Sequence, residues 1–136
     1  MSALTRLLYP LPAVRRSPAM LFAWWESRRP TYNLVVGGSG LITLGVVELL
    51  AALPPHSQLW VPWPAVVVYG VAANVCYSFG FVIEAFLERV WGDDVAPVGP
   101  VLFRQGLIFS VGLTLFPMGV AWLAYLVEVA RSVFKW

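Results

Sequence analysis

The chain has 136 residues, of which 60% are hydrophobic and only 12% are charged, against about 25% charged residues in an average soluble domain. Nine Lys and Arg residues and seven Asp and Glu residues give a formal charge of +2. This composition excludes a soluble globular domain and a disordered chain, and the length excludes an enzyme of several domains.

Residues 1–30 form a basic arm that is interrupted by prolines. Ser17 followed by Pro18 is a typical helix start, with serine as the N-cap and proline at the first helical position. About three turns of helix follow, with Trp24 and Trp25 on their apolar side. Because this segment combines an apolar side with charged residues, we expect an interfacial helix on the cytoplasmic surface of a membrane.

Two tryptophans and two arginines lie close together near the end of this arm. Tryptophan and arginine are the residue types most often found as anchors of protein–protein interfaces. We therefore expect the arm to contact a partner polypeptide through Trp24, Trp25, Arg28 and Arg29. The simpler alternative is an anchor that only holds the chain at the membrane surface.

Three long stretches with almost no charge follow the arm. A bilayer core of about 30 Å needs about 20 apolar residues in a helix, and residues 34–53, 64–86 and 107–130 meet this requirement. The sequence therefore predicts an all-α membrane protein. Residues 31–136 form its domain of three transmembrane helices, which follows the N-terminal interfacial helix of the arm.

Positive charges are distributed unequally between the two sides of such a domain. With three spans, the arm and the second loop lie on the same side, which carries seven positive charges. These are Arg6, Arg15, Arg16, Arg28, Arg29, Arg89 and Arg104. The other side carries Arg131 and Lys135. Because Lys and Arg accumulate on the cytoplasmic side, we expect a cytoplasmic N-terminus and a periplasmic C-terminus.

Each span carries a stripe of small or polar residues at helical spacing. Helices in lipid associate through close packing of small residues and through hydrogen bonds between polar side chains. Spacings of three and four residues place such side chains on one face of a helix. The stripes therefore predict packing seams, either within a bundle or against another protein. The selected residues are Gly38, Gly45, Glu48, Asn74, Tyr77, Glu84, Pro117 and Glu128.

Pro117 lies in the middle of the third span. Proline lacks the backbone N–H that would continue the helical hydrogen bonds, so we expect a kink at this position. We also expect the Thr114 hydroxyl to satisfy part of the carbonyl groups that the proline frees. A hinge used for gating is the alternative.

Three glutamates lie within the spans or at their ends. An ionisable group in a span is costly and is a functional hypothesis by default. We expect Glu48 and Glu128 to approach each other near the outer surface, and Glu84 to pair with an arginine at the cytoplasmic end. The alternative is ion or proton handling along a path that Glu48 and Asn74 line.

Residues that carry catalysis or bind metals are scarce. The sequence has one histidine, His56, and one cysteine, Cys76, so no set of metal ligands has the usual spacing. The serines of the spans have no histidine or lysine within the membrane to activate them. We expect no catalytic residue, no metal and no ligated cofactor, with lipids or pigments held only by apolar contacts. We do not expect nucleic acid as a partner.

Three short motifs are informative together: residues 24–29 (WWESRR), residues 32–33 (YN) and residues 73–77 (ANVCY). They resemble a group of small, uncharacterised bacterial inner-membrane proteins, over about the first two-thirds of the chain. This resemblance implies a multi-pass protein of a bacterial inner membrane, cytoplasmic or intracytoplasmic. It implies no activity.

Two classes of function agree with these features. The first is a non-catalytic accessory or structural subunit that stabilises a larger bacterial membrane complex, with other integral membrane subunits and lipids as its partners. The host would be an energy-transducing assembly, for example a photosynthetic reaction-centre complex. The second class is a small homo-oligomeric carrier or channel that uses Glu48 and Asn74. A membrane enzyme is the least favoured hypothesis.

Overall fold

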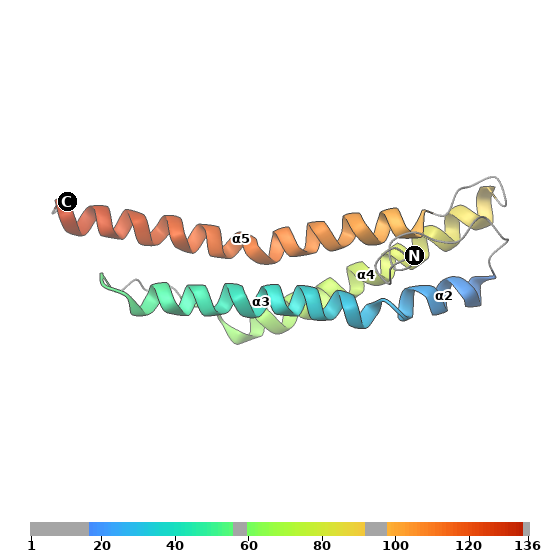
Figure 1. The fold of residues 1–136 in the computed structure, drawn as a ribbon, viewed down its shortest axis with the longest axis horizontal. Helices are drawn as coiled ribbons and strands as arrows, with labels where there is room; N and C mark the ends of the chain where they lie inside the picture. Colours follow the sequence, from blue (N-terminus) through green and yellow to red (C-terminus); the bar gives the residue numbers. More distant parts are fainter. Residues whose placement is uncertain (1–16, 56–59, 92–97, 135–136) are drawn as a thin grey trace, which may run out of the picture.

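The structure, a computed structural model, describes residues 17–55, 60–91 and 98–134, and its regular elements there are all α-helices (Figure 1). The helices are α2 (Pro18–Glu26), α3 (Arg29–Ala52), α4 (Trp63–Trp91) and α5 (Gly99–Phe134). Three helical segments are long and apolar enough to cross a membrane, with α2 and α3 together making the first. The predicted fold class, three transmembrane helices with an N-terminal helix, is confirmed.

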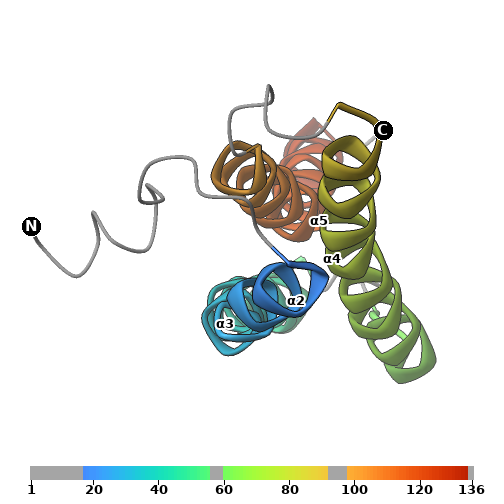
Figure 2. The ribbon, with the colours of Figure 1, turned by 90° about the vertical axis from the view of Figure 1, so that its right-hand side faces the viewer.

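The N-terminal helix α2 begins and ends where its sequence dictates. The Ser17 side chain caps it by accepting a hydrogen bond of 3.3 Å from the Met20 backbone N–H. The helix ends at Glu26, because Pro30 has no N–H to donate to the Glu26 carbonyl and its ring would clash there. After a short turn, α3 continues in nearly the same direction, so that α2 lies in line with α3 and not across it (Figures 1 and 2).

The long helices extend beyond the apolar stretches that predicted them. Helix α3 is the exception at its carboxyl end. It stops at Ala52, because Leu53 precedes a proline and is held in an extended conformation. By contrast, α4 extends past its apolar part to charged residues at its carboxyl end, and α5 includes charged residues on both sides of its apolar centre. At about 1.5 Å per residue, α4 is about 43 Å long and α5 about 54 Å. Both exceed the hydrocarbon core of a bilayer.

The arrangement is a pair of parallel helices crossed by a third. Helices α3 and α5 run side by side in the same direction, and α3 packs mainly against α5. Helix α4 runs in the opposite direction and contacts α5 and α2 near its carboxyl end. Towards its amino end, α4 diverges from α5 (Figures 1 and 2). The closest three-helix packing is therefore at the end where α2 lies.

The face of α3 that packs inside the chain is an aromatic and β-branched stripe. Its buried residues are Tyr32, Val36, Thr43, Val47 and Leu50. The predicted seam of small residues lies elsewhere on the helix, because a side chain built at Gly38 or Gly45 would meet nothing within 4 Å. In this chain the small-residue seam faces outward.

Hydrogen bonds connect α3, α4 and α5 near Pro117. The Thr43 hydroxyl donates to the Thr114 carbonyl over 2.9 Å, in the turn that precedes Pro117. The Tyr69 hydroxyl of α4 lies 2.6 Å from the Thr114 hydroxyl, which donates to the Ser110 carbonyl. Pro117 thus lies within one continuous helix, and a hydroxyl of α3 bonds the carbonyl three residues before it. The Thr114 hydroxyl, which was expected to bond a carbonyl that the proline frees, bonds the Ser110 carbonyl instead.

Candidate functional site

A buried carboxylate joins three helices at the end of the molecule where α2 lies. Glu84 of α4 is only 4% exposed. One of its oxygens accepts a hydrogen bond of 2.7 Å from the Trp25 indole N–H, and the other accepts one of 3.0 Å from the Gly99 backbone N–H at the start of α5. The carboxylate is therefore held by donors from α2 and from the start of α5.

Two glycines make this close packing feasible. A Cβ atom at Gly99 would overlap the Glu84 carboxylate, and a Cβ atom at Gly80 would overlap the six-membered ring of Trp25. Neither glycine needs an unusual backbone angle for this role. Their function here is to leave room for a neighbouring side chain.

Aromatic rings pack around Trp25, the residue whose indole bonds the buried carboxylate. The Trp25 ring meets the Tyr77 ring edge to face at a centroid distance of 5.3 Å, and Phe103 lies 6.4 Å from both. Tyr32 stacks at an angle on Tyr77 with a centroid distance of 4.7 Å. The Tyr77 hydroxyl also donates to the Trp25 backbone carbonyl. Together these four rings form the core that α2, α3, α4 and α5 share.

The four residues expected at a partner interface make contacts within the chain. Trp25 is 2% exposed, and Arg28 is 8% exposed with its guanidinium 3.7 Å above the Trp24 ring. Arg29 forms an ion pair of 2.6 Å with Glu26. The interface assignment of Trp25 is corrected by this geometry, because its ring is already covered by the chain's own helices. The WWESRR motif thus builds the core and the turn at this end.

The Asn74 side chain forms hydrogen bonds with Arg29, at the start of α3, and with its own helix. Its side chain carbonyl accepts from Arg29 over 3.4 Å, and its amide donates to the Gly70 carbonyl of its own helix over 3.1 Å. Glu48 lies nineteen residues beyond Arg29 on α3, or roughly 28 Å along the helix axis. The structure therefore does not bring Glu48 and Asn74 into one site.

The two glutamates expected near the outer surface do not pair. Glu128 forms its ion pair with Arg131 of the same helix, at 3.5 Å. Glu48 is exposed on α3. It has no hydrogen bond or ion pair with any other residue that the structure describes.

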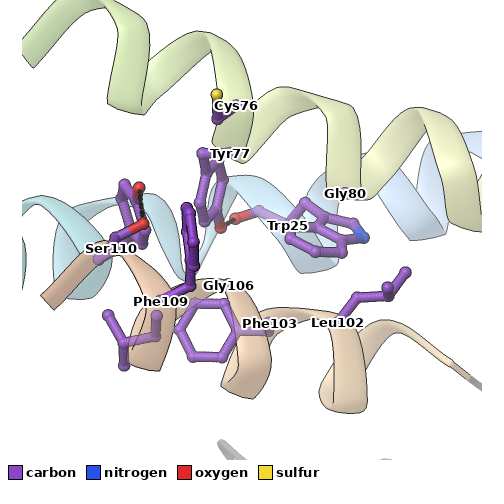
Figure 3. A pocket seen from close by; sticks show the side chains of 11 residues that line it. Trp25, Cys76, Tyr77, Gly80, Leu102, Phe103, Gly106, Phe109 and Ser110 are labelled. Carbon is purple, nitrogen blue, oxygen red and sulfur yellow. Dashed lines mark hydrogen bonds between the residues drawn. The ribbon is translucent and has the colours of Figure 1, made fainter. Parts of the chain in front are cut away.

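A cavity of about 230 Å³ lies beside the aromatic core, between α4 and α5 (Figure 3). Trp25, Tyr77 and Phe103 are buried at its floor, whereas Cys76 and Phe109 are exposed at its mouth. Its full lining consists of Trp25, Tyr32, Cys76, Tyr77, Gly80, Leu102, Phe103, Gly106, Leu107, Phe109 and Ser110. The side chains that line the cavity are aromatic, aliphatic, hydroxyl and thiol groups, and none of them is charged.

The sequence pattern does not single out three residues that pack around Glu84 and Trp25. These are Gly80, Gly99 and Phe103. Helical spacing marks Gly80, which lies three residues after Tyr77 and four residues before Glu84 on the same face. Nothing local marks the other two, because their partners lie on different helices. Only the packing of α5 against α4 brings them to the carboxylate and the rings.

The part of the chain that the structure describes contains no group of three or more His, Cys, Asp or Glu side chains that could hold a metal ion. His56 lies outside the described residues. The hydroxyls of Ser39 and Ser78 donate to carbonyls of their own helices, and Cys76 is an exposed free thiol. The best-defined chemistry of the site is thus the set of hydrogen bonds around Glu84.

No protein family model matches the chain, and comparison with curated proteins and with solved structures finds no match. The function therefore has to be inferred from the residues and their arrangement.

Proposed function

We propose that the chain is a non-catalytic accessory subunit of a larger bacterial inner-membrane complex, and that the outer face of α3 binds the neighbouring subunit. The observation that carries this proposal is the position of Glu48, which is exposed on a membrane-spanning helix without a partner among the described residues. An ionisable group facing lipid is costly. A hydrogen-bonding side chain from another protein removes that cost.

The residues beside Glu48 suit a helix from another subunit. Gly38 and Gly45 lie ten and three residues before it and leave open space above the helix backbone. Small residues let two helices approach closely in lipid, where van der Waals contact and hydrogen bonds replace the hydrophobic driving force. Leu41, which is 73% exposed, supplies an apolar side chain on the same face.

The host that we propose is an energy-transducing assembly, for example a photosynthetic reaction-centre complex, with other integral membrane subunits and lipids as partners. The proposed orientation places the N-terminus in the cytoplasm and the C-terminus in the periplasm. It is supported by the positive charges, since four arginines of the described residues lie at the end that α2 occupies: Arg28, Arg29, Arg89 and Arg104. Arg6, Arg15, Arg16 and Lys135 lie outside the described residues.

Substitutions at Glu48 test the proposal in the native membrane. The tagged chain is extracted with a mild detergent, and the proteins that co-purify are identified and quantified. Glu48→Gln preserves hydrogen bonding and should retain the partner. Glu48→Leu should weaken association by about 1–2 kcal/mol, which corresponds to a loss of roughly five- to thirtyfold in affinity.

Glycine substitutions provide a matched control. Gly45→Leu fills the open face of α3 and should release the partner, whereas Gly112→Leu, at an equally open position of α5, should not. A partner that stays bound in both Gly45→Leu and Glu48→Leu contradicts the proposal. Proton flux in reconstituted vesicles that disappears in Glu48→Gln, with assembly intact, would instead support the carrier, although Glu48 and Asn74 do not share a site in one chain.

A further inference from the structure

Helices α3 and α4 leave an apolar groove between them. Helix α4 diverges from α5 towards its amino end and has little contact with α3 (Figures 1 and 2). A cavity of about 320 Å³ lies between α3 and α4, lined by Gly37, Gly40 and Leu44 of α3 and by Val66, Gly70 and Ala73 of α4. Leu41, which also lines it, is 73% exposed. Because both helices are long and apolar enough to span a membrane, the groove opens to the bilayer.

Missing side chains create the groove. A Cβ atom at Gly37 or Gly70 would meet nothing within 4 Å. On the inner side of the groove, the Tyr69 hydroxyl lies 2.6 Å from the Thr114 hydroxyl, which donates to the Ser110 carbonyl. These two hydroxyls are thus already bonded to each other and to the backbone of α5, and the interior of the groove offers apolar contact.

The end of the groove towards α2 is polar. Asn33 and Asn74 line it there. Arg29, one turn before Asn33, lines a shallower hollow that shares Gly70 and Asn74 with the groove. Asn33 lies twenty residues before Leu53, at the end of α3, or about 30 Å along the helix, which equals the thickness of the hydrocarbon core. The polar end therefore lies at the level of the lipid headgroups.

This polar end presents two hydrogen-bond donors, from Arg29 and Asn33. The Arg29 guanidinium has five N–H groups. Its Nε and Nη2 groups bond the Glu26 carboxylate and the Ser78 hydroxyl, and one N–H of Nη1 bonds Asn74. The second N–H of Nη1 has no partner in the part of the chain that the structure describes, and neither has the exposed Asn33 amide. Both donors suit an oxygen acceptor at the membrane surface.

We propose that a glycerophospholipid binds here, with its phosphate on Arg29 and Asn33 and one acyl chain in the groove. The second chain lies in the shallower hollow, whose apolar lining includes Val67, Val71 and Val75. Such a lipid combines oxygen acceptors at the headgroup level with apolar chains that run from there into the hydrocarbon. Because Glu26 balances the charge of Arg29, a headgroup without net charge, as in phosphatidylethanolamine, suits the site.

The test measures thermal unfolding of the purified, delipidated chain in detergent with dioleoylphosphatidylethanolamine as the probe. A ligand that binds only the folded protein raises the midpoint of unfolding. The lipid should raise it for the wild type and for Gly112→Leu, at an open position of α5, but not for Gly37→Leu, whose side chain fills the groove. Asn33→Ala keeps the groove and removes one donor, and should weaken binding by about tenfold.

Dioleoylglycerol, which has the same two chains and no phosphate, separates a phospholipid site from a general affinity for acyl chains. It should raise the midpoint of the wild type much less than the phospholipid does. The proposal is overturned if the two lipids stabilise the chain equally, or if Asn33→Ala binds the phospholipid with unchanged affinity. It is also overturned if Gly37→Leu, shown to be folded by its helical circular dichroism, responds like the wild type.

Extraction from the native membrane distinguishes a lipid from a protein in the groove. The wild type and Glu48→Leu should both retain phospholipid, measured as phosphorus per chain, even where Glu48→Leu loses the partner at the outer face of α3. The lipid site is therefore tested independently of that partner. A wild type that carries no phospholipid, and that loses a co-purifying protein on Gly37→Leu, would assign the groove to a helix of another subunit and overturn the proposal.

Discussion

At the residue scale, Glu84 stays buried because two N–H donors bond its carboxylate. Burying an ionised group without such partners costs several kcal/mol. Hydrogen bonds to a charged acceptor each contribute about 1.5–3 kcal/mol, which offsets that cost. The Trp25 ring and the first turn of α5 are thereby fixed to the same side chain.

Gly99→Ala tests how closely this site must pack. The added methyl group would overlap the carboxylate of Glu84, so the carboxylate has to move away from its donors. We expect the variant to lose about 1–3 kcal/mol of stability, measured as a lower midpoint of thermal unfolding in detergent. Gly112→Ala on the same helix has open space around it and should not lower the midpoint. Equal midpoints for the two variants would contradict the role assigned to Gly99.

The sequence points to Glu84 but not to its hydrogen-bond partners. The pairing of Glu84 with an arginine at this end of the span stays a prediction. The two N–H donors were not anticipated, since Trp25 lies 59 residues before Glu84 in the sequence and Gly99 offers only its backbone. Helical periodicity relates residues within one helix and carries no information about which residue of another helix they meet.

At the element scale, α3 has two stripes with helical periodicity and uses only one of them inside the chain. The sequence pattern favours the small residues Gly38 and Gly45 for packing, whereas the structure buries the stripe that contains Val36, Thr43 and Val47. In a soluble protein the polar face of a helix points to water, and this identifies the opposite face as the packed one. In a membrane both the lipid-facing and the packed face are apolar, so periodicity predicts that a face exists but not where it points.

Thr43→Val tests the buried stripe. Valine keeps the shape of threonine but cannot donate to the Thr114 carbonyl in the turn before Pro117. Hydrogen bonds between transmembrane helices contribute about 0.6–2 kcal/mol, and we expect a loss of this size in unfolding experiments in detergent. Ser39→Ala is the matched control, because the Ser39 hydroxyl bonds only to the Val35 carbonyl of its own helix. The tie between α3 and α5 would be refuted if Ser39→Ala were the more damaging change.

At the scale of the whole molecule, the two ends of the elongated chain differ in the charged residues that they carry. The end with α2 carries the buried Glu84 and four of the five described arginines, whereas the opposite end carries Arg131 at the far end of α5. The composition and the three apolar stretches were sufficient to predict the three spans. The divergence of α4 from α5 could not be predicted from the sequence. It depends on the close packing at the end where α2 lies, which Gly80 and Gly99 make feasible.

Reporter fusions at the two termini test the predicted orientation. A cytoplasmic reporter should be active at the N-terminus and inactive at the C-terminus, and a periplasmic reporter should give the reverse result. The physical reason is the excess of Arg and Lys on the side of the N-terminus, which membranes retain in the cytoplasm. Two termini that report the same compartment would exclude an odd number of spans.

The pairing of α3 with α5 also has a consequence for the order of synthesis. These are the first and the last of the long helices, and α4, which is made between them, has little contact with α3. A nascent chain that has inserted only α3 and α4 therefore exposes Thr43 and Val47, which pack on α5, to the bilayer until the ribosome has delivered α5. During that interval the incomplete chain is open to capture by proteases or foreign helices. Completion of the buried face of α3 therefore waits for the last span.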